Sequence, residues 1–139
     1  MNTKNIIILA TVFGMLIFGT LSWATVDLTL MAAKTHPNAS GTASFSEDGL
    51  KIAAKGLQPG KVYTVWFVNM KPKKHEIGAG NPPYMFKTDS NGNGIYETHL
   101  SELPFGKWAV LMVVLHPTGD PTDMKNMVGA LSTKIPENR

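Results

Sequence analysis

Cysteine is absent from the 139 residues of this chain. Its absence excludes disulfide bonds, zinc–thiolate sites, c-type haem attachment and a cysteine nucleophile. A blue-copper centre is excluded as well, because that centre needs a thiolate ligand. Stability must therefore come from a hydrophobic core. Hydrophobic residues make up 43% of the chain, an ordinary value for one globular domain.

Charge is also scarce, at 17% of the residues with a formal net charge of +3. Removing residues 1–24, which contain one lysine and no acidic residue, would lower that charge to +2. Such a small excess does not favour nucleic acid as a partner. The one basic cluster is KPKKH, which contains Lys73, Lys74 and His75. A cluster of this kind is typical of a solvated loop or of a contact surface for an acidic partner.

The usual catalytic motifs are missing too. The chain contains no G-x-S-x-G, H-E-x-x-H, phosphate-binding P-loop or G-x-G-x-x-G sequence. Its serines and acidic residues lie mainly in expected turns. We therefore predict that the protein is not an enzyme, and we assign it no catalytic residue and no cofactor.

A long uncharged segment is present at the N-terminus. Residues 5–26 contain no charged side chain, Lys4 precedes them, and Ser22-Trp23-Ala24 follows the apolar run. This layout predicts a signal peptide over residues 1–24 and a mature domain over residues 25–139. The alternative is an uncleaved anchor that attaches the domain to a membrane through residues 6–23. Both interpretations place the domain outside the cytoplasm, in the periplasm or the extracellular space.

The rest of the chain has the pattern of an all-β domain. Short alternating or apolar runs are separated by turn residues such as Q-P-G, N-P-P and P-T-G-D-P. This pattern predicts a single antiparallel immunoglobulin-like or fibronectin-like β-sandwich of about seven to eight short strands. Residues 75–83 are expected to form an irregular surface loop. The expected strands are 26–32, 41–46, 50–55, 61–68, 84–87, 95–100, 108–115 and 128–135.

A calcium-like pattern occurs in T-D-S-N-G-N-G. Asp89, Asn91 and Asn93 occupy positions one, three and five of an EF-hand loop, and a glycine follows at position six. The flanking sequences are strand-like, and Leu100 stands where the closing glutamate should be. Asn-Gly pairs also favour tight hairpin turns. A hairpin turn is the preferred interpretation, and calcium binding is the alternative.

The most distinctive stretch, residues 56–66, reads GLQPGKVYTVW. Pro59 and Gly60 predict a turn, and Tyr63 is placed to return its hydroxyl to the turn backbone, as in the tyrosine corner of sandwich domains. With Gly78, the Asp/Asn-Gly turn and the closing H-P-T-G-D-P-T loop, this pattern resembles the extracytoplasmic β-sandwich domain of anti-sigma-K factors. The resemblance covers about residues 41–135 and implies a similar fold.

The family's regulatory role is not expected to carry over. A membrane anti-sigma factor binds its sigma factor with a helical domain on the cytoplasmic side. Only residues 1–5 precede the apolar run here. We therefore expect a shared fold without sigma-factor binding, because a fold does not by itself determine a function.

Two binding functions remain open. The first is an interaction module, an accessory component of an envelope assembly, whose contact residues are Lys73, Lys74, His75 and Tyr84 and whose partner is another envelope or periplasmic protein. The second is a copper carrier that uses His116, Met124 and Met127, since imidazole and thioether groups suit copper. If 95–100 and 108–115 paired as a hairpin, His99 and His116 would lie at opposite ends of it. The histidines beside Pro37 and Pro117 are otherwise expected to be ordinary loop residues.

Overall fold

The computed structural model describes residues 24–139. The predicted leader, except for Ala24, lies outside these residues. In the described part of the chain, no helix combines the length and the hydropathy that crossing a membrane requires.

Residues 24–139 form strands joined by turns and loops and contain no helix. Each predicted strand overlaps an observed one, so the prediction of an all-β domain is confirmed. The additional strand is β5, which occupies part of the expected surface loop at 75–83. The strands are β1 (Val26–Ala32), β2 (Ser40–Phe45), β3 (Gly49–Lys55), β4 (Val62–Asn69), β5 (His75–Gly78), β6 (Met85–Lys87), β7 (Gly94–His99), β8 (Val110–His116) and β9 (Val128–Lys134).

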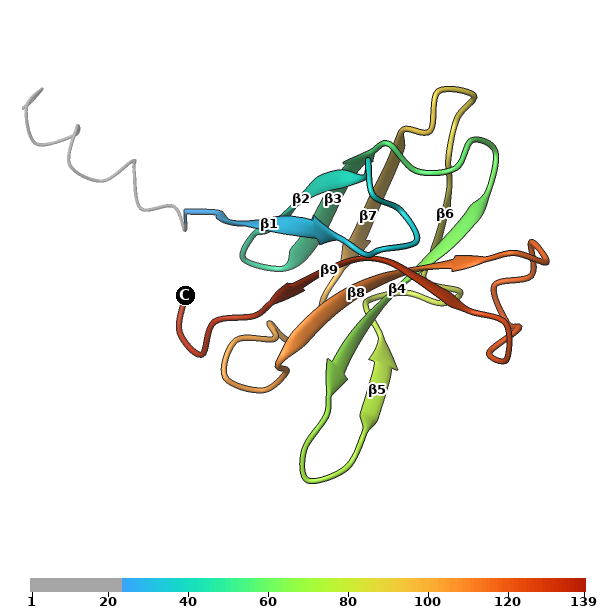
Figure 1. Cartoon of the computed structure of the whole chain (residues 1–139). Helices are drawn as coiled ribbons and strands as arrows, with labels where there is room; N and C mark the ends of the chain where they lie inside the picture. Colours follow the sequence, from blue (N-terminus) through green and yellow to red (C-terminus); the bar gives the residue numbers. More distant parts are fainter. Residues whose placement is uncertain (1–23) are drawn as a thin grey trace, which may run out of the picture.

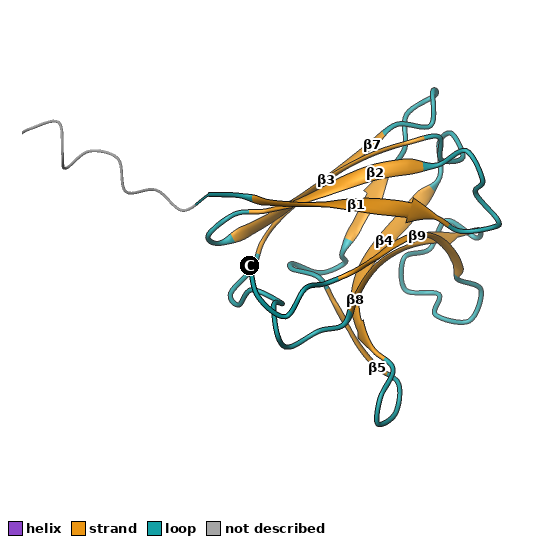
Figure 2. Ribbon diagram, turned by 60° about the vertical axis from the view of Figure 1, so that its left-hand side comes forward, coloured by secondary structure: helices purple, strands orange, loops and turns teal. Residues whose placement is uncertain are grey.

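All the strand pairs are antiparallel, and the main path runs β5-β4-β8-β9-β1-β2-β3-β7, with β6 paired to β4. Strand β1 connects two parts of this path, because Val26–Leu30 pair with β2 whereas Met31 and Ala32 pair with β9. Figure 2 shows β1, β2, β3 and β7 along one side of the domain and β4, β8 and β9 along the other. We call these sides the first half and the second half of the sheet.

The hydrophobic core lies where the two halves pack together. Tyr63, Val65 and Phe67 alternate along β4 and are almost fully buried. Phe67 stacks on Phe45 of β2 with a centroid distance of 6.4 Å, so side chains of both halves meet in one core. Burial of each large apolar side chain contributes about 1.5–3 kcal/mol. Strands β4 and β8 are central in the second half, because each pairs on both of its edges.

The predicted tyrosine corner is present. The backbone N–H of Gln58 donates to the Tyr63 hydroxyl at 2.9 Å, across the turn that contains Gly60. Gly60 has a φ of 65°, a conformation that glycine adopts at little cost. The corner therefore fixes the entry of the chain into β4.

The strand pairing excludes a hairpin of residues 95–100 with residues 108–115, which the sequence left possible. Strands β7 and β8 do not form a hairpin, since β7 pairs with β3 and β8 pairs with β4 and β9. Sequence neighbours often pair through a short connection. Here the connection at 100–109 instead passes from one half of the sheet to the other (Figure 1).

Candidate functional site

The predicted basic contact residues lie on the β4–β5 hairpin. Its strands pair from Trp66–Gly78 to Asn69–His75, and its tip, residues 70–74, is exposed. Lys73, Lys74 and His75 are all exposed at or beside this tip. Figure 1 shows the hairpin extending away from the other strands, at the lower edge of the domain. The structure thus brings three of the four predicted partner-binding residues together.

The hairpin is fixed to the domain by polar contacts. The Asn69 side chain donates to the carbonyl of Lys107 at 3.0 Å, and its oxygen accepts from the backbone N–H of Ala109 at 2.8 Å. The His75 ring lies 5.3 Å from the Trp108 ring between centroids. These contacts come from the segment before β8, which the sequence did not link to the hairpin. They hold the tip in one orientation.

Tyr84, the fourth predicted contact residue, lies at the opposite end of the hairpin. Its ring packs against Trp66 at a centroid distance of 5.5 Å, and a Cβ on Gly78 would meet that ring at 2.3 Å. Trp66 and Gly78 are three pairs from the Asn69–His75 pair, or roughly 10 Å along the strands. Tyr84 is half-buried and has a φ of 64°, which is unusual for a bulky residue. It supports the base of the hairpin and is separate from its basic tip.

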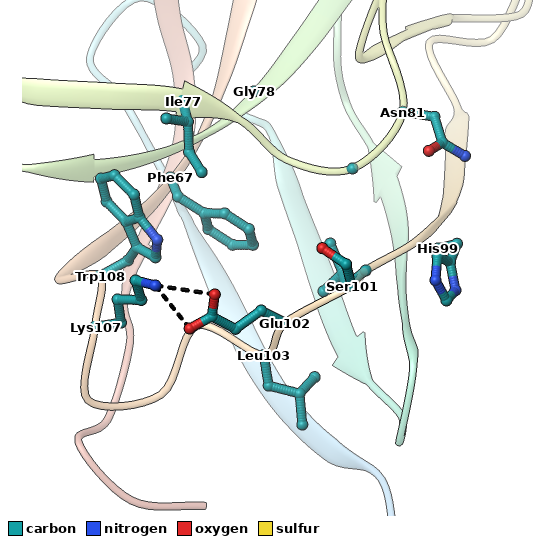
Figure 3. Close-up of a pocket in the computed structure, with 12 residues that line it drawn as sticks. Phe67, Ile77, Gly78, Asn81, His99, Ser101, Glu102, Leu103, Lys107 and Trp108 are labelled. Carbon is teal, nitrogen blue, oxygen red and sulfur yellow. Dashed lines mark hydrogen bonds and ion pairs between the residues drawn. The ribbon is translucent and has the colours of Figure 1, made fainter.

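A cleft of about 290 Å³ lies beside the hairpin. Figure 3 shows Ile77, Phe67 and Trp108 on one side of it and Ser101 and His99 on the other. The mouth is bridged by an ion pair between Lys107 and Glu102 at 2.7 Å. Both members of this ion pair are largely exposed and form an ionic rim, whereas the buried Phe67 contributes to an apolar floor. Sequence reasoning missed this cleft, because its lining comes from several separate segments of the chain.

The calcium-like turn is organised by internal hydrogen bonds. Asp89 Oδ1 accepts from the backbone N–H groups of Asn91 and Asn93, each at 2.9 Å. The turn joins β6 to β7, which pair with β4 and β3 respectively, so it is not the hairpin turn that the sequence predicted. The chain changes from one half of the sheet to the other at this point. The conformation of the turn is thus accounted for by the Asp89 side chain and by Gly92, whose φ is 80°.

His116 is buried at the end of β8, with only 1% of its surface exposed. Its Nε2 lies 2.6 Å from Thr64 Oγ1, and the Trp66 indole N–H donates to the same oxygen at 2.7 Å. Its Nδ1 is buried and, within residues 24–139, has no hydrogen-bond partner. The expectation of an ordinary loop histidine is therefore wrong for His116. Its side chain shares the outward face of the second half of the sheet with Thr64 and Trp66.

The other two candidate copper ligands lie in the β8–β9 loop. Leu115 pairs with Val128, which places Met127 opposite His116, one residue beyond the last pair. Met127 is half-buried, and Met124 is 43% exposed. The loop is organised by Asp120, which accepts from Thr122, and by Asp123, which accepts from Asn126. Hydrogen bonds from Thr122 lower the pKa of the Asp120 carboxyl, with a smaller contribution from nearby His116.

His36 lies in the loop between β1 and β2, as expected, but it is not an ordinary loop residue, because only 4% of its surface is accessible. Its Nε2 lies 3.2 Å from the Tyr63 hydroxyl, and its Nδ1 lies 2.9 Å from Thr35 Oγ1. His99, by contrast, is exposed on β7. The described residues contain no group of three or more His, Cys, Asp or Glu side chains arranged to hold a metal ion.

Comparison with known proteins gives no family assignment. A scan against protein-family models finds no matching family, and a search of the curated proteins finds no match. Its function is therefore inferred from the surfaces and side chains of this chain.

Proposed function

We propose that this protein is an exported, non-catalytic interaction module that binds an acidic surface of another envelope protein through its β4–β5 hairpin. The observation that supports the proposal is the exposed hairpin tip, which presents Lys71, Lys73 and Lys74 together. Exposed apolar side chains flank these lysines, with Met70 59% and Ile77 41% accessible. A basic tip with apolar flanks combines two properties that a protein interface uses.

Each property has a separate physical role. The lysines attract an acidic partner and raise the rate of encounter, and this effect weakens as salt is added. Met70 and Ile77 supply apolar area, which stabilises the complex once it has formed. The Asn69 contacts hold the hairpin in place before binding. Such preorganisation lowers the entropy that is lost on association.

The fold and the location belong to the same proposal. The tyrosine corner and the two packed halves support an immunoglobulin-like or fibronectin-like sandwich, similar to the extracytoplasmic domain of anti-sigma-K factors. The uncharged segment at residues 5–26 supports export through a signal peptide or attachment through an uncleaved anchor. An accessory subunit of an envelope assembly fits both features.

The test is co-isolation from the native host after mild crosslinking. We expect a stable protein partner, whose recovery falls strongly in the triple variant Lys73→Ala, Lys74→Ala, His75→Ala. A matched control replaces two exposed lysines and one exposed histidine elsewhere, with Lys55→Ala, Lys87→Ala and His99→Ala. Loss of the partner in both variants would indicate a general effect of charge. Retention of the partner in the hairpin variant would refute the proposed surface.

A further inference from the structure

We propose that the outward face of the second half of the sheet contains a binding site for a soft monovalent metal ion, Cu(I), formed by His116 Nδ1 with the thioethers of Met127 and Met124. This proposal is independent of the hairpin interface. His116 pairs with Val62 at the start of β4, whereas the hairpin tip begins after Asn69 at its end. The two places are roughly 23 Å apart along β4, at about 3.3 Å per residue.

The first argument is the buried nitrogen without a partner. His116 Nδ1 is inaccessible to water and makes no hydrogen bond among the described residues. Leaving a buried polar atom unpaired costs about 1–3 kcal/mol. The other ring nitrogen is engaged, since Nε2 lies 2.6 Å from Thr64 Oγ1. The ring is therefore held through Nε2, and Nδ1 is the nitrogen left without a protein partner; in a metal-binding histidine too, the nitrogen that does not bind the metal is held by a hydrogen bond.

The second argument is the position of the methionines. The β8–β9 register places Met127 opposite His116, and Met124 precedes it in the same loop. Hydrogen bonds to Asp120 and Asp123 fix the shape of this loop. Met127 is half-buried and Met124 is 43% exposed, so the loop offers one partly buried and one exposed methionine.

The ligand chemistry selects the metal. A neutral imidazole and two thioethers are soft or borderline donors, which suit Cu(I) better than hard cations such as calcium or magnesium. All three donors are uncharged, so they do not neutralise the charge of the ion, which would be partly buried. A single positive charge costs far less to bury than a double one. The proposed site should therefore prefer Cu(I) or Ag(I) to divalent ions.

Binding requires a change of tautomer but no net release of protons. Without the metal, Trp66 donates to Thr64 Oγ1. Because His116 Nε2 is the acceptor within reach of the Thr64 hydroxyl, we assign Thr64 as the donor in that contact and place the imidazole proton on Nδ1. When Nδ1 binds the ion, the proton is on Nε2 and is donated to Thr64 Oγ1. The Thr64 hydroxyl rotates to accept it, and the Trp66 N–H continues to donate to the same oxygen. The indole N–H of Trp66 is thus a spectroscopic reporter of the site.

The experiment is an anaerobic titration of the protein isolated from its host. Cu(I) is kept reduced with ascorbate and supplied from a chromogenic chelator, and Ag(I) serves as a redox-inert second probe. We expect one ion per chain and a shift of the Trp66 indole N–H resonance on titration with Ag(I). His116→Gln, which replaces the ring nitrogen near Thr64 but removes Nδ1, should abolish the transfer of Cu(I).

A second variant keeps the proposal testable if His116→Gln does not fold. Met127→Leu conserves volume and removes only the sulfur, so it should fold and should weaken Cu(I) binding by at least about tenfold. The matched control is Met31→Leu, at a methionine on β1 that is 64% exposed, and it should leave the affinity unchanged. Failure to remove Cu(I) from the chelator would overturn the proposal. An affinity in Met127→Leu equal to that of the control would overturn it as well.

Discussion

The buried imidazole of His36 contacts the hydroxyl of Tyr63, with 3.2 Å between Nε2 and the phenol oxygen. The neighbouring hydrogen bonds fix the direction of this contact. Thr35 Oγ1 donates to the carbonyl of Gly129, so it accepts from His36 Nδ1–H. The neutral imidazole therefore has a lone pair on Nε2, to which Tyr63 donates. His36 thus completes the tyrosine corner from the β1–β2 loop.

This contact predicts that acid destabilises the fold. Burial lowers the pKa of His36 below its ordinary value of 6.5. As the pH falls below 6.5, the unfolded chain takes up a proton at this residue before the folded chain does. Stability is therefore complete above pH 6.5 and is lost as the pH falls toward the folded pKa, by at most about 1.4 kcal/mol per pH unit from this group. Urea unfolding at a series of pH values measures this slope.

The matched variants for this prediction are His36→Gln and His99→Gln. The first removes the buried titrating group and should flatten the pH dependence of the free energy of unfolding. The second alters an exposed histidine and should leave the dependence unchanged. A slope in His36→Gln equal to that of the parent protein would contradict the assignment to His36.

Replacement of Tyr63 by Phe should destabilise the domain by about 1–3 kcal/mol, because it removes the acceptor of the Gln58 N–H and the donor to His36. This cost exceeds the 0.5–1.5 kcal/mol typical of a single hydrogen bond. Thermal and urea unfolding provide the measurement. Tyr84→Phe, at a half-buried tyrosine outside the corner, is the control and should change the stability by less than about 0.5 kcal/mol. Equal losses in the two variants would rule out a special role for the corner hydroxyl.

Calcium should not stabilise the protein. Asp89 Oδ1 already accepts two backbone hydrogen bonds, and these account for the shape of the turn. We expect the same melting temperature in excess calcium and in excess chelator. A site saturated at 100 times its dissociation constant would add about 2.7 kcal/mol, which raises the melting temperature by several degrees. Such a rise, if lost in Asp89→Ala, would establish calcium binding at this turn.

Local patterns were sufficient to predict most of the strands. In β3, the alternation of Leu50, Ile52 and Ala54 with exposed residues indicates a half-buried strand, and the structure has that burial pattern. Pro59 and Gly60 followed by Tyr63 predict the corner for the same reason, because the contact spans only a few residues. Where the determining contacts are local, the sequence is informative.

Features set by distant residues could not be predicted in this way. Strand β5 is short, follows a loop with three lysines and one proline, and is a strand because it pairs with β4. The burial of His116 depends on Thr64, which is 52 positions away in the sequence. The connection from β7 to β8 resembled a hairpin loop, and only packing between the two halves of the sheet determines its path. The same limit applied to the cleft beside Trp108, whose lining comes from several separate segments.

The last prediction concerns the base of the hairpin, where Gly78 lies under the ring of Tyr84. A Cβ at position 78 would lie 2.3–2.4 Å from three atoms of that ring, closer than any real contact permits. The ring is also packed against Trp66, so it cannot move away without losing that contact. Gly78→Ala should therefore destabilise the protein by about 1–3 kcal/mol, the usual cost of overpacking.

A double-mutant cycle separates this clash from a general effect of alanine. Because Tyr84→Ala removes the ring, the Gly78→Ala change should cost much less in the Tyr84→Ala background, giving a coupling of about 0.5–3 kcal/mol. Gly119→Ala is a poor control, because Gly119 has a φ of 81°. Gly129→Ala is suitable, because the φ of Gly129 is not positive and a Cβ there would have only the Met112 methyl carbon within 4 Å, at 3.9 Å. Additive effects of Gly78→Ala and Tyr84→Ala would show that the ring does not support the hairpin. In that case the orientation of the basic tip would depend on the Asn69 hydrogen bonds and on the contact between His75 and Trp108.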